Sequence, residues 1–177
     1  YPDRWGQLPL HQPANSGMIA VSIQRLGAAD IGLARAMNAL FAKAFEEPAH
    51  YADAPPDDAW LAEILARESV VALVALTGER VVAAAVAYEL DKLEQRRREL
   101  YLYDLAVAAD HRRRGIATAL IDTLRHHAAA RGCSTLFVQA DDGDDQAIAL
   151  YTKLGKREDV VHFDIIPAGV GGIGPSD

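Results

Sequence analysis

The sequence has a single cysteine, Cys133, in 177 residues, which excludes an internal disulfide and a zinc site built from cysteines. It lacks an apolar run near the roughly 20 residues that a membrane-spanning helix needs, and its longest apolar runs, 69–77 and 81–90, have the length of strands. Its six histidines show no metal-ligand spacing, and the first 17 residues lack the pattern of a signal peptide. We therefore predict a cytoplasmic protein that has no metal site and no membrane partner.

Positive charge is scarce, because 18 Lys and Arg residues face 25 Asp and Glu residues and give a net charge of −7. Such a surface repels phosphate backbones, so we expect cationic partners and no nucleic acid. The charges are also separated along the chain. Basic clusters lie at 96–98 and 112–114, and acidic clusters lie at 46–58 and 141–145. This separation suits a protein that holds an anion and a cation at once.

The length predicts one domain, and hydrophobic periodicity predicts a mixed α/β fold. We place the domain at 18–166, between an extension at 1–17 and a flexible tail at 167–177. The expected strands are 19–25, 69–77, 80–90, 99–108, 134–140 and a last strand near 158–165. The expected helices are 31–45, a short helix through 60–65 capped by Asp57 or Asp58, 114–131 and 145–154. The order strand, helix, strand between 99 and 140 predicts a right-handed parallel crossover.

An arginine-rich loop joins the predicted strand 99–108 to the helix that follows it. Its pattern, Arg112-x-x-Gly115-x-Ala117, places backbone N–H groups and the positive end of a helix dipole where an anion can bind. Gly115 leaves room for a pyrophosphate, and the three arginines at 112–114 add positive charge. The alternative is a solvated basic turn before a helix. The single glycine excludes a dinucleotide-binding fingerprint, and the missing Gly-Lys-Ser/Thr excludes a P-loop.

Leu105-Ala106-Val107 followed by this loop resembles the coenzyme A pyrophosphate loop of the GNAT N-acetyltransferase superfamily. The segments 99–107, 111–121, 138–145, 150–155 and 162–165 are similar to the type I aminoglycoside 3-N-acetyltransferases. The resemblance covers about 18–166 and is strongest from Glu99 onward. It implies the GNAT (acyl-CoA N-acyltransferase) fold, a mixed central sheet with flanking helices in which the fourth and fifth strands splay apart. It also implies acetyl-CoA as co-substrate, without a metal, and homodimers are common in the superfamily.

The resemblance assigns a cofactor-binding role to ten residues: Leu105, Ala106, Val107, Arg112, Arg113, Arg114, Gly115, Ile116, Ala117 and Thr118. Backbone groups of Leu105 and Val107 are expected to bond the pantetheine arm or the thioester oxygen. Tyr151 is expected to protonate the departing thiolate, and its alternative role is packing against the sheet. Two positions depart from the family pattern, since Lys156 replaces an aromatic residue and Asp144 replaces a cofactor-contacting asparagine.

The acceptor amine arrives as an ammonium ion, so the site needs carboxylates. Asp104 precedes Leu105 directly, and we predict that it is the catalytic base, directly or through a water molecule. Its alternative role is an aspartate at a β-bulge or strand edge that pairs with one of the arginines. The predicted substrate-binding residues are Glu99, Tyr103, Asp141, Asp142 and Asp144. The carboxylates at 141–145 repel one another unless a cation is recruited, although a solvated turn with Asp144 or Asp145 as helix cap is the alternative.

The predicted function is acetyl transfer from acetyl-CoA to the 3-amino group of a deoxystreptamine aminoglycoside of the gentamicin class, which confers resistance. Two alternatives stay open. One keeps the reaction and takes another polyamine or a protein amine as acceptor. The other is a non-catalytic module that binds coenzyme A or a cationic ligand.

Overall fold

The computed structural model describes residues 21–46 and 54–168. The predicted extension at 1–17, the first residues of the predicted first strand, most of the acidic segment 46–58 and the tail beyond 168 lie outside these ranges. The chain divides into two compact units between Gln139 and Ala140. Within the described ranges, no group of His, Cys, Asp and Glu side chains is arranged to hold a metal ion, and no helix is long and apolar enough to cross a membrane.

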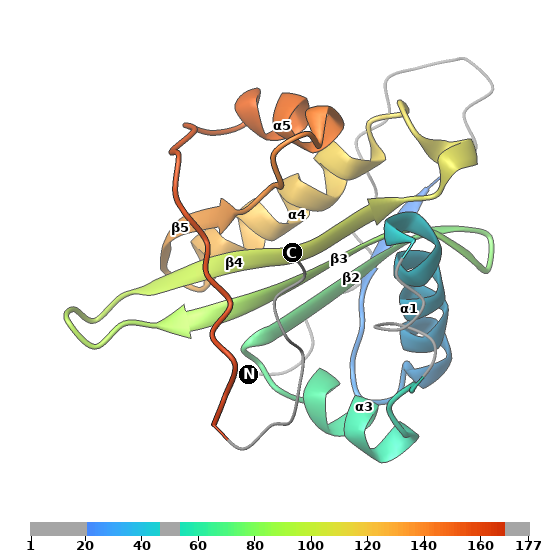
Figure 1. Ribbon diagram of the computed structural model, residues 1–177. Helices are drawn as coiled ribbons and strands as arrows, with labels where there is room; N and C mark the ends of the chain where they lie inside the picture. Colours follow the sequence, from blue (N-terminus) through green and yellow to red (C-terminus); the bar gives the residue numbers. More distant parts are fainter. Residues whose placement is uncertain (1–20, 47–53, 169–177) are drawn as a thin grey trace. The chain divides into compact units, whose positions relative to one another are not determined.

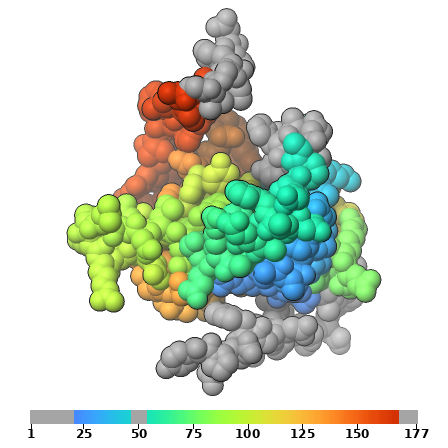
Figure 2. Space-filling model, turned by 90° about the horizontal axis from the view of Figure 1, so that it is seen from below, coloured from blue at the N-terminus to red at the C-terminus, as the bar shows by residue number. Residues whose placement is uncertain are grey.

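A five-stranded mixed sheet forms the centre of the first unit, as the periodicity predicts (Figure 1). In spatial order its strands are β1 (Ser22–Arg25), β2 (Val70–Thr77), β3 (Arg80–Asp91), β4 (Arg98–Val107) and β5 (Cys133–Val138). The pairs from β1 to β4 are antiparallel, whereas β4 and β5 are parallel. The long β3–β4 hairpin forms a yellow-green lobe at one side of Figure 2.

Helices cover both faces of this sheet. On one face lie α1 (Ile31–Phe45) and α3 (Asp58–Leu65), whose residues Met37, Phe41 and Leu61 share a core with Val74 and Val86. On the other face, α4 (Ile116–Ala130) contacts β3, β4 and β5 and completes the predicted crossover (Figure 1). Buried Leu and Val side chains on both faces supply the main favourable contribution to folding.

Local sequence explains where the helices of this unit begin. The Asp57 carboxylate accepts a hydrogen bond from the Trp60 N–H at 2.8 Å, which caps α3 as expected. Helix α4 begins at Ile116, two residues later than the pattern predicts, because Gly115 has a left-handed φ of 78° and stands before the first helical residue.

The second unit contains α5 (Asp145–Thr152), which is capped by the Asp144 carboxylate through the Ala147 N–H at 3.0 Å. The predicted strand near 158–165 is wrong, because the residues from 156 to 167 have no strand structure. Val160, Phe163 and Ile165 are more than 70% exposed there. Alternating apolar residues are typical of a strand with one buried face. A strand also needs a neighbouring strand for its backbone hydrogen bonds, and the described residues provide none for this segment.

Candidate active site

A β-bulge in β4 decides which way the predicted base points. Tyr101 and Leu102 lie opposite Tyr88 and Ala87, but Asp104 lies opposite Val86, so Tyr103 is an extra residue in β4. Residues paired across a ladder point to the same face, and Val86 belongs to the core beneath α1. Strict alternation would place Asp104 on the face of Leu102, which is buried on the α4 side. The bulge instead brings Asp104 to the face that carries Tyr101 and Tyr103.

The same region of β4 separates from β5. The parallel pairing ends at Leu102 opposite Val138, where β5 itself ends, while β4 continues to Val107 along β3. Beyond Leu102, the edge of β4 turned away from β3 is therefore unpaired within the described sheet, which matches the splayed arrangement that the resemblance implies. The peptide groups of 105–107 on this edge pair with no described strand, and the Val107 carbonyl accepts a hydrogen bond from Arg112 Nε at 3.2 Å.

The loop after β4 presents open backbone donors. A 3-10 turn, Ala109–His111, leads into the loop, in which Arg113 and Gly115 have positive φ angles of 62° and 78°. The bond from Ala119 N to Gly115 O, at 3.0 Å, is the first of α4, so the N–H groups of 116–118 have no carbonyl partner in the helix. The first turn has no acidic residue and no side-chain cap. A Cβ on Gly115 would meet nothing within 4 Å, so the approach to these donors is open. The loop thus offers open backbone donors beside three arginines, as an anion site requires.

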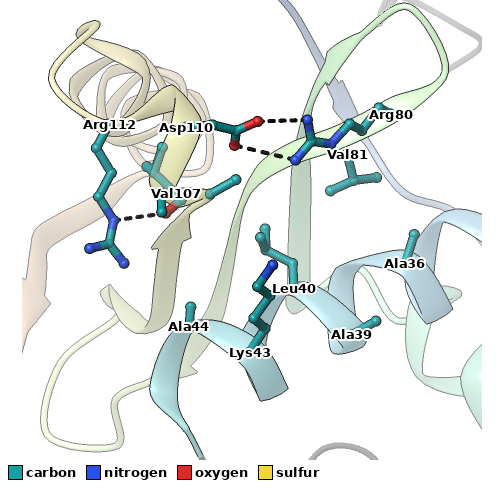
Figure 3. A pocket seen from close by; sticks show the side chains of 12 residues that line it. Ala36, Ala39, Leu40, Lys43, Ala44, Arg80, Val81, Val107, Asp110 and Arg112 are labelled. Atoms are coloured by element: carbon teal, nitrogen blue, oxygen red, sulfur yellow. Dashed lines mark hydrogen bonds and ion pairs between the residues drawn. The ribbon is translucent and has the colours of Figure 1, made fainter.

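A pocket of about 410 Å³ lies between α1 and the C-terminal end of β4 (Figure 3). Lys43 reaches toward it from α1 and Arg112 from the loop, whereas Arg80 turns away to Asp110. The Arg80 guanidinium donates to both carboxylate oxygens of Asp110, at 2.8 and 3.2 Å, and these bonds hold the Asp110 pKa well below its usual value. This pair ties the start of β3 to the turn before the arginine loop. Neither Asp104 nor Tyr103 lines this pocket.

The structure brings only some of the predicted site residues together. Tyr103 and Asp104 lie side by side on one face, directly before Leu105, and the Tyr103 side chain is 61% exposed. Glu99 lies on the same strand, but Arg97 and Lys92 hold its carboxylate in ion pairs. This pairing favours a structural role for Glu99 over contact with a substrate ammonium group.

The remaining predicted residues belong to the second unit. Asp144 caps α5, which is the alternative role considered for it, while Asp141 and Asp142 are exposed before that helix. Burial, with a smaller contribution from the Asp144 charge, raises the pKa of Tyr151 to about 12. Tyr151 is therefore protonated throughout the neutral range, as an ordinary tyrosine is too, and it is a weaker acid than one in water.

Tyr88 and Phe137 were not selected by the sequence analysis, although both have aromatic ring contacts with the tyrosines of β4. The signal that would reveal them is the cross-strand register, which places Tyr88 opposite Tyr101 and Phe137 beside it. A single strand's own pattern does not contain that information.

Comparison with known proteins decides the family. A model described as the acetyltransferase (GNAT) family matches residues 34–156, which is more than two thirds of the chain. The chain belongs to the GNAT family. An aminoglycoside acetyltransferase structure from an uncultured soil metagenomic sample is 44% identical, covers 84% of this chain and 99% of its own, and has a TM-score of 0.82. The predicted GNAT fold is thereby confirmed.

Two further relatives differ in the acceptors that they are named for. A second soil metagenomic aminoglycoside acetyltransferase, crystallised with sisomicin, is 29% identical over 83% of this GNAT chain and 96% of its own, with a TM-score of 0.77. The ribosomal protein bS18 alanine N-acetyltransferase of Escherichia coli is 33% identical over 69 residues, which are 39% of this chain and 47% of the relative. The chain spans less than half the length of the curated relatives that it matches.

Proposed function

We propose that this chain transfers the acetyl group of acetyl-CoA to the 3-amino group of a deoxystreptamine aminoglycoside of the gentamicin class. One observation carries the proposal. The bulge at Tyr103 turns the Asp104 carboxylate to an exposed aromatic face, directly before the stretch of β4 that leaves β5. The two similar aminoglycoside acetyltransferases, one of them crystallised with sisomicin, support this class of acceptor.

The arginine loop would hold acetyl-CoA, which supplies a thioester carbonyl activated toward amines. The N–H groups of 116–118 and the side chains of 112–114 bind the pyrophosphate through charge-assisted hydrogen bonds. The unpaired edge of β4 at 105–107 bonds the pantetheine arm, and an N–H there stabilises negative charge on the carbonyl oxygen. Holding both reactants in line supplies on the order of 7–11 kcal/mol of the barrier.

Asp104 is then the proton acceptor of the reaction and Tyr151 is its proton donor. Asp104 takes the proton of the acceptor ammonium, directly or through one water molecule, so that the nitrogen lone pair can attack the carbonyl carbon. A C–N bond forms, the attacking nitrogen loses its second proton to solvent, and the C–S bond breaks. The Tyr151 phenol, which like any tyrosine is protonated at neutral pH, donates a proton to the departing thiolate and regains one from solvent. No acyl-enzyme is needed, and Cys133 takes no part.

A protein amine is the second candidate acceptor. The alanine N-acetyltransferase similarity favours it, because it covers 69 residues at 33% identity. The same chemistry serves an N-terminal amine, since a protein N-terminus is also an ammonium ion for part of its population at neutral pH. The two candidates therefore differ in how the acceptor is bound and not in how it is acetylated.

We expect thiol release from acetyl-CoA in the presence of gentamicin and sisomicin, and little with spermidine or an alanine-terminated peptide. The matched control acceptor is gentamicin already acetylated at its 3-amino group. It should give no thiol release, because the reacting nitrogen is blocked while the rest of the molecule is unchanged. Turnover of this control would show that another nitrogen reacts. Turnover of the peptide alone would favour the protein amine.

We expect Gly115→Ala to weaken coenzyme A binding about tenfold in a calorimetric titration. An alanine at φ 78° meets no clash but costs about 1–2 kcal/mol in the left-handed region, so the loop would relax away from the pyrophosphate. Gly132→Ala is the matched control, because Gly132 has a φ of 71° and equal space just beyond the other end of α4. That variant should lose stability without losing coenzyme A affinity. Equal affinities in both variants would contradict the loop assignment.

A further inference from the structure

Four aromatic rings from three neighbouring strands lie together on the face that carries Asp104. Tyr103 contacts Tyr88 edge to face, with ring centroids 5.9 Å apart, and contacts Tyr101 in the same manner at 5.4 Å. Tyr101 in turn stacks flat on Phe137 at 4.7 Å. The planes of Tyr103 and Tyr101 differ by 73°, so the rings form two walls of a corner rather than a flat layer.

These four rings do not have the same role. The Tyr101 hydroxyl donates to Gln139 Oε1 at 2.7 Å, and its ring is fixed by Phe137, so Tyr101 is held from both sides. Tyr103 is 61% exposed, and Tyr88 is 36% exposed. Tyr101 is thus used in packing, whereas Tyr103 and Tyr88 keep ring surface that the sheet does not cover. The exposed rings are instead available to a ligand.

The charge beside the rings is negative. Asp104 lies opposite Val86, which shares a face of β3 with Tyr88, and its charge adds to the rise that burial causes in the pKa of Tyr88 and Tyr101. Three of the four cations of the nearby hairpin are in ion pairs, since Arg97 and Lys92 bind Glu99 and Arg98 binds Asp91, and the fourth is Arg96. Aromatic ring faces carry partial negative charge too. A cationic ligand therefore finds attraction from both the rings and the carboxylate.

We propose that Tyr88 and Tyr103 form the acceptor platform of the enzyme, on which an aminosugar ring lies with its ammonium group toward Asp104. This inference rests on the proposed function and identifies residues that determine its acceptor specificity. The ring C–H groups of a sugar pack against the faces of the tyrosines, and its ammonium group gains cation–π attraction. The two phenol hydroxyls donate to and accept from sugar hydroxyls. A flexible polyamine has the charge of this ligand but not its rigid ring.

The test is steady-state kinetics of Tyr103→Leu, Tyr88→Leu and the conservative Tyr103→Phe with gentamicin as acceptor. For each leucine variant we expect a KM for gentamicin about tenfold higher and a kcat within about threefold of the unmodified enzyme. The KM for acetyl-CoA should not change, and Tyr103→Phe should stay within about threefold in KM because it keeps the ring. Thermal melting of each variant checks that the exposed substitutions leave the fold intact.

Gentamicin KM values within twofold of the unmodified enzyme in both leucine variants would overturn the platform. So would an equal rise in the KM for acetyl-CoA, which would indicate a general disturbance of β4. Calorimetric titration with gentamicin separates this inference from the proposed function. If the unmodified protein binds gentamicin without turning it over, the proposed function is wrong. The platform is then supported if the leucine variants lose gentamicin binding and contradicted if they keep it. If it neither binds nor turns over gentamicin, both proposals fall.

Discussion

Replacing Asp104 by asparagine is expected to lower kcat at least about a hundredfold while leaving the affinity for coenzyme A unchanged. General base catalysis contributes on the order of 10²–10⁴ in rate, and the amide of asparagine cannot take a proton from an ammonium group. The shape of the side chain is kept, so the bulge and the contacts of the neighbouring tyrosines should persist. Thiol release at saturating gentamicin measures kcat, and a calorimetric titration measures coenzyme A binding.

The matched control is Asp122→Asn on α4. Asp122 is another aspartate, which forms an ion pair with Arg125 at 2.8 Å and lies on an exposed helix surface. Its replacement should leave kcat within about twofold. The rate against pH gives a second criterion, because the acidic limb that reports the base should be present in the unmodified enzyme and absent in Asp104→Asn. If Asp104→Asn keeps half of its kcat, Asp104 is not the base.

The arginine loop and the order of elements could be predicted from the sequence because both are local. The apolar pattern after the arginine loop predicts a helix over 114–131, and the structure has α4 there, although it begins at Ile116 because Gly115 has a left-handed φ of 78°. The alternation in 99–108, followed by the helix and the strand after it, predicts the parallel crossover that β4, α4 and β5 form. Each of these signals lies within one stretch of chain and needs no knowledge of a partner.

The site itself depends on register, which a single strand does not encode. Strict alternation places Asp104 in the core beside Leu102, and only the extra residue at Tyr103 brings it to the open face. The ion pairs that hold Glu99 depend on the course of the β3–β4 hairpin. The segment 158–165 is the opposite case, because its sequence has the pattern of a strand but it pairs with no strand in the described structure. Pairing between segments decided each of these outcomes.

The second large effect concerns Glu89, a carboxylate whose side chain is only 3% exposed. We expect Glu89→Gln to lower the free energy of unfolding by about 3–5 kcal/mol. Arg131 binds its two oxygens at 2.9 to 3.2 Å, His127 Nε2 lies 2.8 Å away and Arg98 lies at 3.7 Å. Removing the negative charge replaces the charge-assisted hydrogen bonds from Arg131 and His127 by weaker neutral ones at a buried side chain, and Arg131 and Arg98 keep only their surface partners Glu68 and Asp91. Chemical denaturation of the two proteins measures the difference.

Low pH should decrease the free energy of unfolding through the cluster of Glu89, His127 and Arg131. Burial lowers the pKa of His127 more than its hydrogen bond to Glu89 raises it. As the pH falls, His127 is therefore protonated in the unfolded chain before it is protonated in the folded protein. The free energy of unfolding accordingly decreases below about pH 6.5. Burial alone would raise the Glu89 pKa, but the hydrogen bonds from Arg131 and His127 lower it overall. Its contribution is therefore present above its ordinary pKa and is lost as the pH falls through the lower, folded value. Glu89→Gln should flatten the second, more acidic part of this decline.

Glu68→Gln separates the effect of burial from the effect of pairing. Glu68 binds the same Arg131, at 3.3 Å, but its side chain is 83% exposed, so water compensates the arginine when the carboxylate is removed. That variant should lose less than about 1 kcal/mol. At pH 7, a difference of a few kcal/mol between the two variants corresponds to roughly 6–12 °C in melting temperature for a chain of this size. Equal losses would mean that Glu89 contributes no more than a surface ion pair, and that solvent reaches the end of α4 despite the burial of His127 and Glu89.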